Sequence, residues 1–234
     1  MAFPSNLPAP RTPDPMQAPP LRWGILGTGW IADQFCRSVA AHTRQVLAAV
    51  GSRSLESARA FAEGQGIPRA HGSYEDLVAD PEVDVIYVAT PHNFHHAHVL
   101  LALNAGKHVL VEKPMALNHA QAAEMVALAR SKGLFFAEAL WTYFLPKFDV
   151  VDQLLADGIL GEIRSVYTEY GEYLPPDHRL FDPRLAGGPL LDLGTYPVSF
   201  ITRLMGVPER VVGLAQPDPS GVNGQLAVVM ADRR

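Results

Sequence analysis

A lysine and a tyrosine far apart in this sequence could together do acid–base chemistry. Lys113 follows an apolar run that ends at Val111, so we expect its ammonium group to be partly removed from water. Partial desolvation of a charge costs free energy, which a partner or a reaction would justify. Tyr196 follows Asp192 by four residues, a spacing that places both on one face of a helix. A free tyrosine has a pKa of about 10 and is a poor base unless a cation stabilises its phenolate. Lys113 would supply that cation, so the pair predicts proton transfer at a substrate hydroxyl.

Each of the two residues also has an ordinary structural interpretation. Lys113 could extend its ammonium into solvent while Pro114 merely ends the strand. Tyr196 could be a buried tyrosine with a single hydrogen-bond partner. Either residue alone leaves the choice open, but together they favour catalysis because each explains the other.

A glycine-rich turn near the N-terminus has the pattern G-x-G-x-x-A, between the apolar run 21–26 and a helical pattern that extends to about residue 41. The first glycine permits a tight turn, the second lets the backbone approach a pyrophosphate, and the small third residue lets helix and strand pack closely. A plain glycine turn is the alternative, which the strand–turn–helix context disfavours. The predicted cofactor-binding residues of this turn are Gly27, Thr28, Gly29, Trp30, Ile31 and Ala32.

The end of the second predicted strand, residues 46–51, indicates which dinucleotide binds. An NAD site usually carries Asp or Glu there, which bonds the ribose 2′-hydroxyl. This sequence instead has Ser52, Arg53 and Ser54. Two hydroxyls and a guanidinium suit a 2′-phosphate, with an ordinary solvated arginine as the alternative. We therefore predict NADP, with NAD as the second choice.

Four histidines follow the next predicted strand, residues 83–89, at the sheet edge where ligands bind in such folds. No carboxylate or thiolate lies beside them, and His92 precedes the predicted helix. We therefore expect no metal site, and a histidine-based metal hydrolase is the weakest of the hypotheses. Thr90, Pro91 and His95 are predicted to contact the cofactor. The four histidines are His92, His95, His96 and His98.

Alternating strands and helices would position these residues. The run 83–89 is rich in β-branched side chains, which is typical of a strand buried on both faces. The alternation with short links predicts an α/β fold with a doubly wound parallel sheet over residues 21–140. The predicted strands are 21–26, 46–51, 83–89, 108–111 and 134–137, and the predicted helices are 30–41, 54–64, 94–105 and 118–131.

The pattern changes after about residue 140, and residues 141–234 form a predicted second domain of α+β type. A helix over 145–157 leads to an alternating strand over 162–173, then to a loop rich in Pro and Gly. A helix over 191–205 and two strand-like stretches, 210–215 and 225–230, follow. Three strands would form an incomplete, open and mostly antiparallel sheet.

Composition excludes several classes of protein. Lys and Arg number 19 against 24 Asp and Glu, so the chain lacks the excess of basic residues that is typical of nucleic-acid-binding proteins. The single cysteine, Cys36, allows no internal disulfide. Apolar runs are far shorter than the roughly 18 residues of a membrane span, and no secretory signal is evident, so we expect a soluble cytoplasmic protein. Residues 1–20 contain seven prolines and are expected to form a flexible, disordered leader.

Taken together, the motifs resemble the Gfo/Idh/MocA oxidoreductases, most closely the branch of NADP-dependent dihydrodiol and D-xylose dehydrogenases. The resemblance extends from about residue 21 to the C-terminus, and Glu-Lys-Pro combined with Asp-x-Gly-x-Tyr is its most specific part. The tyrosine of that second motif marks this branch, because many relatives have histidine there. The resemblance rests on residues 27–32, 52–54, 90–91 with His95, 105–109, 112–114, 138–142 and 192–197.

The resemblance implies a Rossmann domain followed by a substrate domain. It implies that Lys113 and Tyr196 are the catalytic pair, that Asp192 orients the substrate, and that Glu112 lies at the cofactor. The implied activity is hydride transfer between NADP and a hydroxyl carbon of a small sugar or other cyclic polyol, or of a trans-dihydrodiol. The residues implied to contact the substrate are Trp141, Arg179, Asp192 and Tyr196.

The sequence departs from the family pattern in three respects. Tyr143 stands where relatives usually have Arg, and Pro189 interrupts a glycine-rich run, so substrate choice could differ. The family normally continues well beyond Arg234, completing a sheet that also forms its homodimer face. We therefore expect a fragment or a truncated reading frame that does not form this dimer. A catalytically inactive NAD(P)-binding sensor is the second hypothesis.

Overall fold

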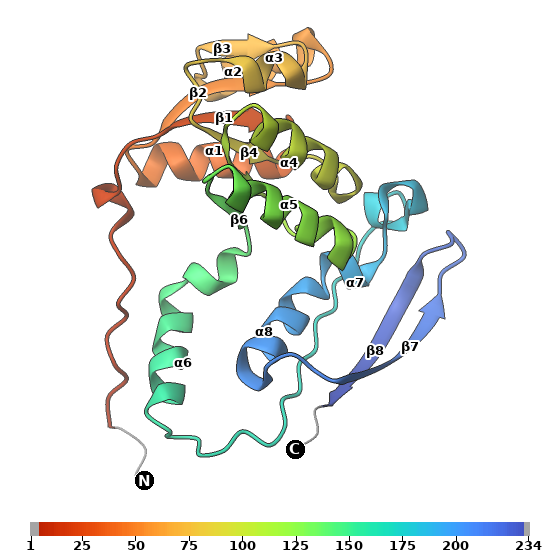
Figure 1. Ribbon diagram of the computed structural model, residues 1–234. Helices are drawn as coiled ribbons and strands as arrows, with labels where there is room; N and C mark the ends of the chain where they lie inside the picture. Colours follow the sequence, from red (N-terminus) through yellow and green to blue (C-terminus); the bar gives the residue numbers. More distant parts are fainter. Residues whose placement is uncertain (1–4, 232–234) are drawn as a thin grey trace. The chain divides into compact units, whose positions relative to one another are not determined.

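The computed structural model describes residues 5–231, and its chain divides into two compact units (Figure 1). The N-terminal unit is formed by Pro13–Ala139. The C-terminal unit is formed by residues 5–12 together with residues 140–231.

A six-stranded parallel sheet forms the centre of the N-terminal unit, in the order β3-β2-β1-β4-β5-β6. β1 pairs with β2 on one side and with β4 on the other, so the strand order reverses between β1 and β4. Ligands of such sheets bind at this reversal, beyond the carboxyl ends of the strands. The strands are β1 (Arg22–Leu26), β2 (Val46–Gly51), β3 (Arg69–His71), β4 (Val85–Val88), β5 (His108–Val111) and β6 (Phe136–Glu138).

Helices cover both faces of this sheet, which confirms the predicted doubly wound α/β architecture (Figure 1). Local signals set their ends: Ser54 accepts a hydrogen bond from the Ser57 N–H at the start of α2, and Gly66 ends that helix in the left-handed conformation. The helices are α1 (Trp30–His42), α2 (Leu55–Gln65), α3 (Tyr74–Ala79), α4 (His95–Asn104) and α5 (His119–Ser131), with short 3₁₀ turns η1 (Pro15–Gln17) and η2 (His92–Phe94).

Two apolar clusters hold the helices against the sheet. One cluster joins α3, α4 and α5 to the strands and includes the fully buried Ile86 and Leu103. The other joins α1 and α2 to the opposite face and includes the fully buried Ile25 and Cys36. Burying one such side chain contributes about 1.5–3 kcal/mol, so these clusters fix the strand ends that carry the predicted site. Within residues 5–231, no helix is long and apolar enough to cross a bilayer.

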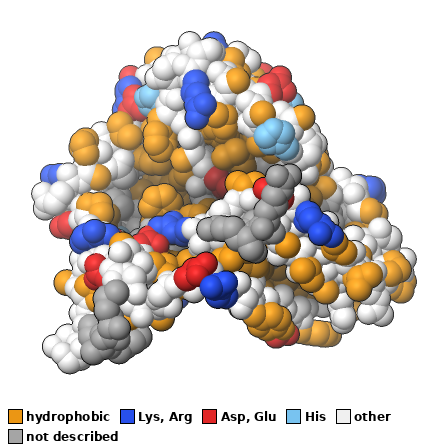
Figure 2. All heavy atoms as spheres, turned by 60° about the horizontal axis from the view of Figure 1, so that its bottom comes forward, with side chains coloured by type: hydrophobic (Ala, Val, Ile, Leu, Met, Phe, Trp, Pro, Cys, Tyr) orange, Lys and Arg blue, Asp and Glu red, His pale blue; other side chains and the backbone are white. Residues whose placement is uncertain are grey.

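Short helices and a two-stranded antiparallel sheet make up the C-terminal unit. β7 and β8 pair with Val212 opposite Val229, and both of these side chains are exposed. Figure 2 shows apolar side chains at the surface of the molecule among charged ones. The elements are η3 (Trp141–Phe144), α6 (Pro146–Ala156), η4 (Arg179–Phe181), η5 (Pro183–Leu185), α7 (Pro189–Asp192), α8 (Thr195–Met205), β7 (Arg210–Pro217) and β8 (Asn223–Ala231).

The segment 162–173, predicted to be a third strand of this unit, is irregular coil (Figure 1). It pairs with neither sheet of the described chain. The alternating pattern indicates which way side chains would point, but a strand also needs a neighbour for its backbone hydrogen bonds. The predicted third strand is therefore wrong, and the antiparallel sheet of the described chain has two strands.

The helix predicted over 191–205 is interrupted, because α7 ends at Asp192 and α8 begins at Thr195. Gly194 lies in the interruption, where an added Cβ would come within 2.5 Å of the Leu190 carbonyl oxygen. Only glycine fits so close to a neighbouring backbone. Asp192 and Tyr196 therefore belong to different helices, and the expectation that they share one face of a single helix is wrong.

The proline-rich leader contacts the C-terminal unit. The backbone N–H and guanidinium of Arg11 donate hydrogen bonds to the Asp149 carboxylate on α6. The Gln153 amide donates to the Ala9 carbonyl oxygen at 2.9 Å. Residues 1–4 of the predicted leader lie outside the described residues, and the flexibility expected of residues 1–20 stays a prediction.

Candidate functional site

The glycine-rich turn joins β1 to α1 in a conformation that needs its first glycine. Gly27 has a φ of 109°, and an added Cβ would lie 3.1 Å from the Ala89 carbonyl oxygen. Its N–H donates to the Gly51 carbonyl oxygen at 3.0 Å, which ties the turn to the end of β2. Ala32, in the first turn of α1, is fully buried where this helix packs on the sheet. The turn therefore has the form that the sequence predicts.

The N-terminus of α1 is open toward solvent. Gly29 is the N-cap, no side chain of the described chain caps this end, and a Cβ on Gly29 would meet no atom within 4 Å. The first amides of a helix lack partners within the helix and carry partial positive charge. Trp30 is 73% exposed beside them. This space and these donors fit the phosphates of a dinucleotide. The other turn residues are Thr28, which is half-buried, and Ile31, whose side chain packs on the apolar cluster.

The serine–arginine–serine sequence lies at the carboxyl end of β2. Ser52 is buried, and its N–H donates to the His71 carbonyl oxygen at 3.2 Å. Ser54 caps α2, so its hydroxyl is engaged as an acceptor. Arg53 between them is exposed, and its charge acts on Tyr74 and on His98. The arginine is therefore the member of this sequence whose side chain is most accessible to a bound anion.

His95 is buried, and each nitrogen of its ring lies close to a backbone carbonyl oxygen. Nε2 lies 2.8 Å from the Thr90 carbonyl oxygen, and Nδ1 lies 2.8 Å from that of Pro114. Burial lowers the pKa of His95 to about 4, so the ring is neutral at pH 7 and donates one of these hydrogen bonds. His95 would therefore act on a cofactor through the two backbone turns that it contacts, one at Thr90 and one at Pro114.

Other histidines of this region also have local partners. The Thr90 hydroxyl lies 2.9 Å from His98 Nδ1, and His96 Nε2 lies 2.8 Å from the Glu124 carboxylate. Among the residues that the structure describes, no group of three or more His, Cys, Asp or Glu side chains is arranged to hold a metal ion.

Lys113 lies in a turn just beyond β5, next to the buried carboxyl group of Glu112. The Tyr87 hydroxyl and the Lys113 N–H donate to the two oxygens of Glu112. Burial raises the pKa of Glu112, and these donors together with the Lys113 charge oppose that shift. Glu112 thus links the turn to Tyr87 of β4. Tyr87 was not among the predicted site residues, and its signal is a lone hydroxyl in the aliphatic strand Val-Ile-Tyr-Val.

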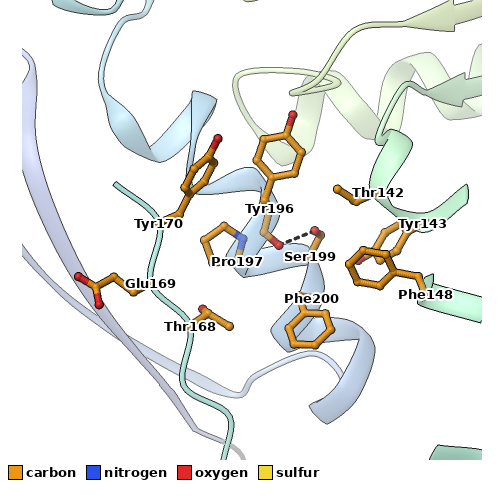
Figure 3. A pocket seen from close by; sticks show the side chains of 10 residues that line it. All are labelled: Thr142, Tyr143, Phe148, Thr168, Glu169, Tyr170, Tyr196, Pro197, Ser199 and Phe200. Carbon is orange, nitrogen blue, oxygen red and sulfur yellow. Dashed lines mark hydrogen bonds between the residues drawn. The ribbon is translucent and has the colours of Figure 1, made fainter. Parts of the chain in front are cut away.

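Tyr196 lies in the first turn of α8, surrounded by aromatic rings. The Trp141 indole donates a hydrogen bond to the Tyr196 hydroxyl at 3.2 Å, and the two rings meet edge to face. The Tyr170 ring lies 5.8 Å from that of Tyr196. Figure 3 shows the hydroxyls of Tyr170 and Tyr196 on the same side. The structure thus brings the predicted Trp141 and Tyr196 together and adds Tyr170.

A pocket of about 220 Å³ lies beside Tyr196 within the C-terminal unit (Figure 3). Half of its lining residues are aromatic, and Glu169 lies at one side. Tyr143, at the position where relatives usually have Arg, belongs to this wall and lies under the Arg203 guanidinium, 4.6 Å from it. The lining residues are Thr142, Tyr143, Phe148, Thr168, Glu169, Tyr170, Tyr196, Pro197, Ser199 and Phe200.

Asp192 and Arg179 form an ion pair in the same unit. The carboxylate of Asp192 is buried, and Arg179 Nη2 lies 3.3 Å from both of its oxygens. Arg179 is more exposed than Asp192, so the arginine is the partner that reaches toward solvent. Two predicted substrate-contacting residues are therefore adjacent. The predicted convergence of Lys113 with Tyr196 joins the two units and stays a prediction.

Comparison with protein families matches both parts of the chain. Residues 21–139 match the Gfo/Idh/MocA oxidoreductase family domain with an NAD-binding Rossmann fold, and residues 148–231 match the Gfo/Idh/MocA C-terminal domain. All the predicted site residues except Trp141 lie inside these two segments.

Two mammalian relatives share one enzyme name. The trans-1,2-dihydrobenzene-1,2-diol dehydrogenase of Bos taurus is 45% identical over 215 residues, and that of Homo sapiens is 41% identical. Each alignment covers 90% of this chain and 64% of the relative. The chain therefore spans slightly less than two thirds of the length of these relatives.

Solved structures show a similar fold. The structure of KijD10, a 3-ketoreductase from Actinomadura kijaniata in complex with NADP and TDP-benzene, is 28% identical with a TM-score of 0.80. That match covers 92% of this chain and 67% of the other. An NAD binding oxidoreductase from Klebsiella pneumoniae is 25% identical with a TM-score of 0.71, covering 91% and 66%. The resemblance predicted from the motifs is confirmed.

Proposed function

Because this chain belongs to the Gfo/Idh/MocA oxidoreductase family, we propose that it transfers hydride between NADP and a hydroxyl carbon of a sugar or cyclic trans-diol. The observation that carries the proposal is the extent of the similarity to dihydrodiol dehydrogenases. It covers the glycine-rich turn of the N-terminal unit and also the segment that bears Asp192 and Tyr196.

The pocket beside Tyr196 supports a ring-shaped substrate. Aromatic side chains make up half of its lining residues, and the rings of Tyr170 and Tyr196 offer flat surfaces and hydroxyls. A carbocycle or pyranose with vicinal hydroxyls combines an apolar ring face with polar edges, which such walls accommodate. The relatives' name, trans-1,2-dihydrobenzene-1,2-diol dehydrogenase, describes a substrate of this form.

NADP is the proposed cofactor, bound at the carboxyl edge of the parallel sheet. The open N-terminus of α1 would hold the pyrophosphate. The exposed Arg53 guanidinium would bind the 2′-phosphate, with Ser52 and Ser54 beside it. The solved KijD10 complex contains NADP, which supports this choice over NAD.

In the proposed mechanism, Tyr196 accepts the proton of the substrate hydroxyl and Lys113 stabilises the resulting negative charge. The nicotinamide supplies the hydride acceptor when the cofactor is bound. The Trp141 indole orients the Tyr196 hydroxyl, because its N–H donates a hydrogen bond to the hydroxyl oxygen. Asp192, held by Arg179, orients a second substrate hydroxyl. Reduction of a ketone runs through the same residues in reverse.

Turnover by the purified chain tests this proposal. Formation of NADPH, followed by its absorbance, is expected with trans-dihydrobenzenediol, pentoses or hexoses. Tyr196→Phe should lower kcat by about two orders of magnitude or more while NADP affinity is retained. If a folded sample that binds NADP turns over none of these substrates, the proposal is rejected.

A second candidate is an NAD(P)-binding protein without turnover. The segment 162–173 pairs with no strand of the described chain and the β7–β8 pair is largely exposed, which favours this reading. Under this second candidate, NADP raises the melting temperature, no substrate is turned over, and Tyr196→Phe leaves the melting temperature with NADP unchanged. Turnover by the wild type therefore distinguishes the two candidates.

A further inference from the structure

Three consecutive residues of the turn that carries Lys113 are held by three different side chains. The Lys113 N–H donates to Glu112 at 3.2 Å, the Pro114 carbonyl oxygen lies 2.8 Å from His95 Nδ1, and the Met115 N–H donates to Glu138 Oε1 at 2.7 Å. These side chains come from the end of β5, from α4 and from the end of β6. The direction in which Lys113 leaves the backbone is therefore fixed by groups on three elements.

Glu138 lies beside Lys113 because of the sheet register. It is the last residue of β6 and is paired with Val111, the last residue of β5, from which the chain continues to Glu112 and Lys113. Burial raises the pKa of Glu138, and the positive charge of Lys113 opposes that shift. The same charge opposes the raised pKa of Glu112. One ammonium and two carboxyl groups thus interact at one corner of the N-terminal unit.

We propose that Glu138 is a positioning residue for Lys113, holding the turn through the Met115 N–H and fixing the ammonium by its charge. Both carboxylates bind a backbone N–H of this turn, and Glu138 does so from a separate strand, β6. A carboxylate is costly to bury, and an adjacent cation offsets that cost. The role of Lys113 in the reaction rests on the proposed function, whereas the arrangement of the two charges does not.

The titratable groups that face this corner within the N-terminal unit come from several elements. They are Glu112 just after β5, Glu138 from β6, Tyr87 from β4 through its bond to Glu112, and the neutral His95 from α4. Glu138→Gln removes one negative charge and keeps an oxygen that accepts the Met115 N–H. Glu124→Gln removes a charge from α5 at the exposed pair with His96 and serves as the control.

The chain has four lysines, which makes Lys113 observable by NMR without turnover. With lysine labelled at Cε, Lys113→Met identifies the Lys113 signal. In Glu138→Gln, the Lys113 Cε signal at neutral pH is expected to shift and broaden, because the ammonium loses the carboxylate that fixes it. In Glu124→Gln the signal is expected to stay at its wild-type position. An unchanged Lys113 signal in a folded Glu138→Gln overturns the proposal. If Glu138→Gln does not fold, Glu138→Asp keeps the charge and should keep the wild-type signal, and a shifted signal there overturns it.

Kinetics of the same variants separate this inference from the proposed function. In Glu138→Gln, kcat is expected to fall about ten-fold because the cation is less well fixed, while the Kd for NADP stays unchanged. An unchanged kcat in a folded Glu138→Gln overturns the inference, even where Lys113→Met abolishes turnover. If the wild type turns over no substrate, the proposed function fails, and the NMR signal of Lys113 alone decides about Glu138.

Discussion

The Trp141 indole N–H donates a hydrogen bond to the Tyr196 hydroxyl at 3.2 Å, within one unit of the chain. The two rings also meet edge to face, so the indole holds the phenol ring and its oxygen together. The contact is partly exposed, because Trp141 is 55% accessible. The residue proposed as the base therefore already has one partner that orients its hydroxyl.

Trp141→Phe should lower kcat by about ten-fold, because the Tyr196 hydroxyl loses the hydrogen bond that orients it, a loss of roughly 1.5 kcal/mol. The Kd for NADP should not change. Steady-state kinetics with a trans-dihydrodiol and fluorescence titration with NADP provide the measurements. Tyr173→Phe is the control, since Tyr173 is 90% exposed and should have no effect. A wild-type kcat for Trp141→Phe would contradict this account of the contact.

Arg53→Ala should weaken NADP binding by about 10- to 100-fold, the loss expected for a charge-assisted hydrogen bond to phosphate. Binding of NAD should change less than about two-fold, since NAD lacks the 2′-phosphate. Calorimetric titration of both cofactors checks this. Arg59→Ala removes another exposed guanidinium further along α2 and should leave both affinities unchanged. Equal affinities of the wild type for the two cofactors would remove the argument.

Gly27→Ala should lower the unfolding free energy by about 1–3 kcal/mol, because alanine disfavours a φ of 109° and its Cβ would press on the Ala89 carbonyl oxygen. Gly64→Ala offers the opposite case. Gly64 lies inside α2 with open space around it, so alanine should be neutral or stabilise by up to about 1 kcal/mol. Urea denaturation of both variants gives the two values. A loss of equal size in both would show that the turn conformation is not the cause.

Stability should depend on pH through His95. Its pKa is about 4 in the folded chain against 6.5 for an unperturbed histidine, so the unfolded chain takes up the proton first as the pH falls. The contribution of His95 is complete above about pH 6.5 and is lost toward pH 4, in total about 3 kcal/mol. His95→Gln should flatten the pH profile of the unfolding free energy in this range. The exposed His42→Gln should retain the wild-type profile, and the same profile in both variants would refute the prediction.

Much of the N-terminal unit can be predicted because its signals are local. The expected strands 46–51 and 108–111 have the same bounds as β2 and β5, and the G-x-G-x-x-A motif falls at the β1–α1 turn. The predictions lack β3 and α3, because segments of three and six residues carry too little periodicity to be recognised. Local pattern thus locates the cofactor edge of the sheet.

The surroundings of the proposed catalytic residues are less predictable, because they depend on contacts between distant segments. Nothing near Tyr170 in the sequence indicates that its ring would pack on Tyr196. Glu138 reaches Met115 only through the β5–β6 register. The break between α7 and α8 depends on how closely Gly194 approaches the Leu190 carbonyl oxygen, which the helical periodicity of this segment does not reveal.

The leader gives this chain an unusual order of assembly. Residues 5–12 belong to the same compact unit as residues 140–231, so the parallel-sheet unit is inserted between two pieces of its neighbour. During synthesis on a ribosome, Arg11 emerges long before Asp149, its partner on α6. The inserted unit can therefore fold first. The ion pair that holds residues 5–12 forms only after α6 has been synthesised.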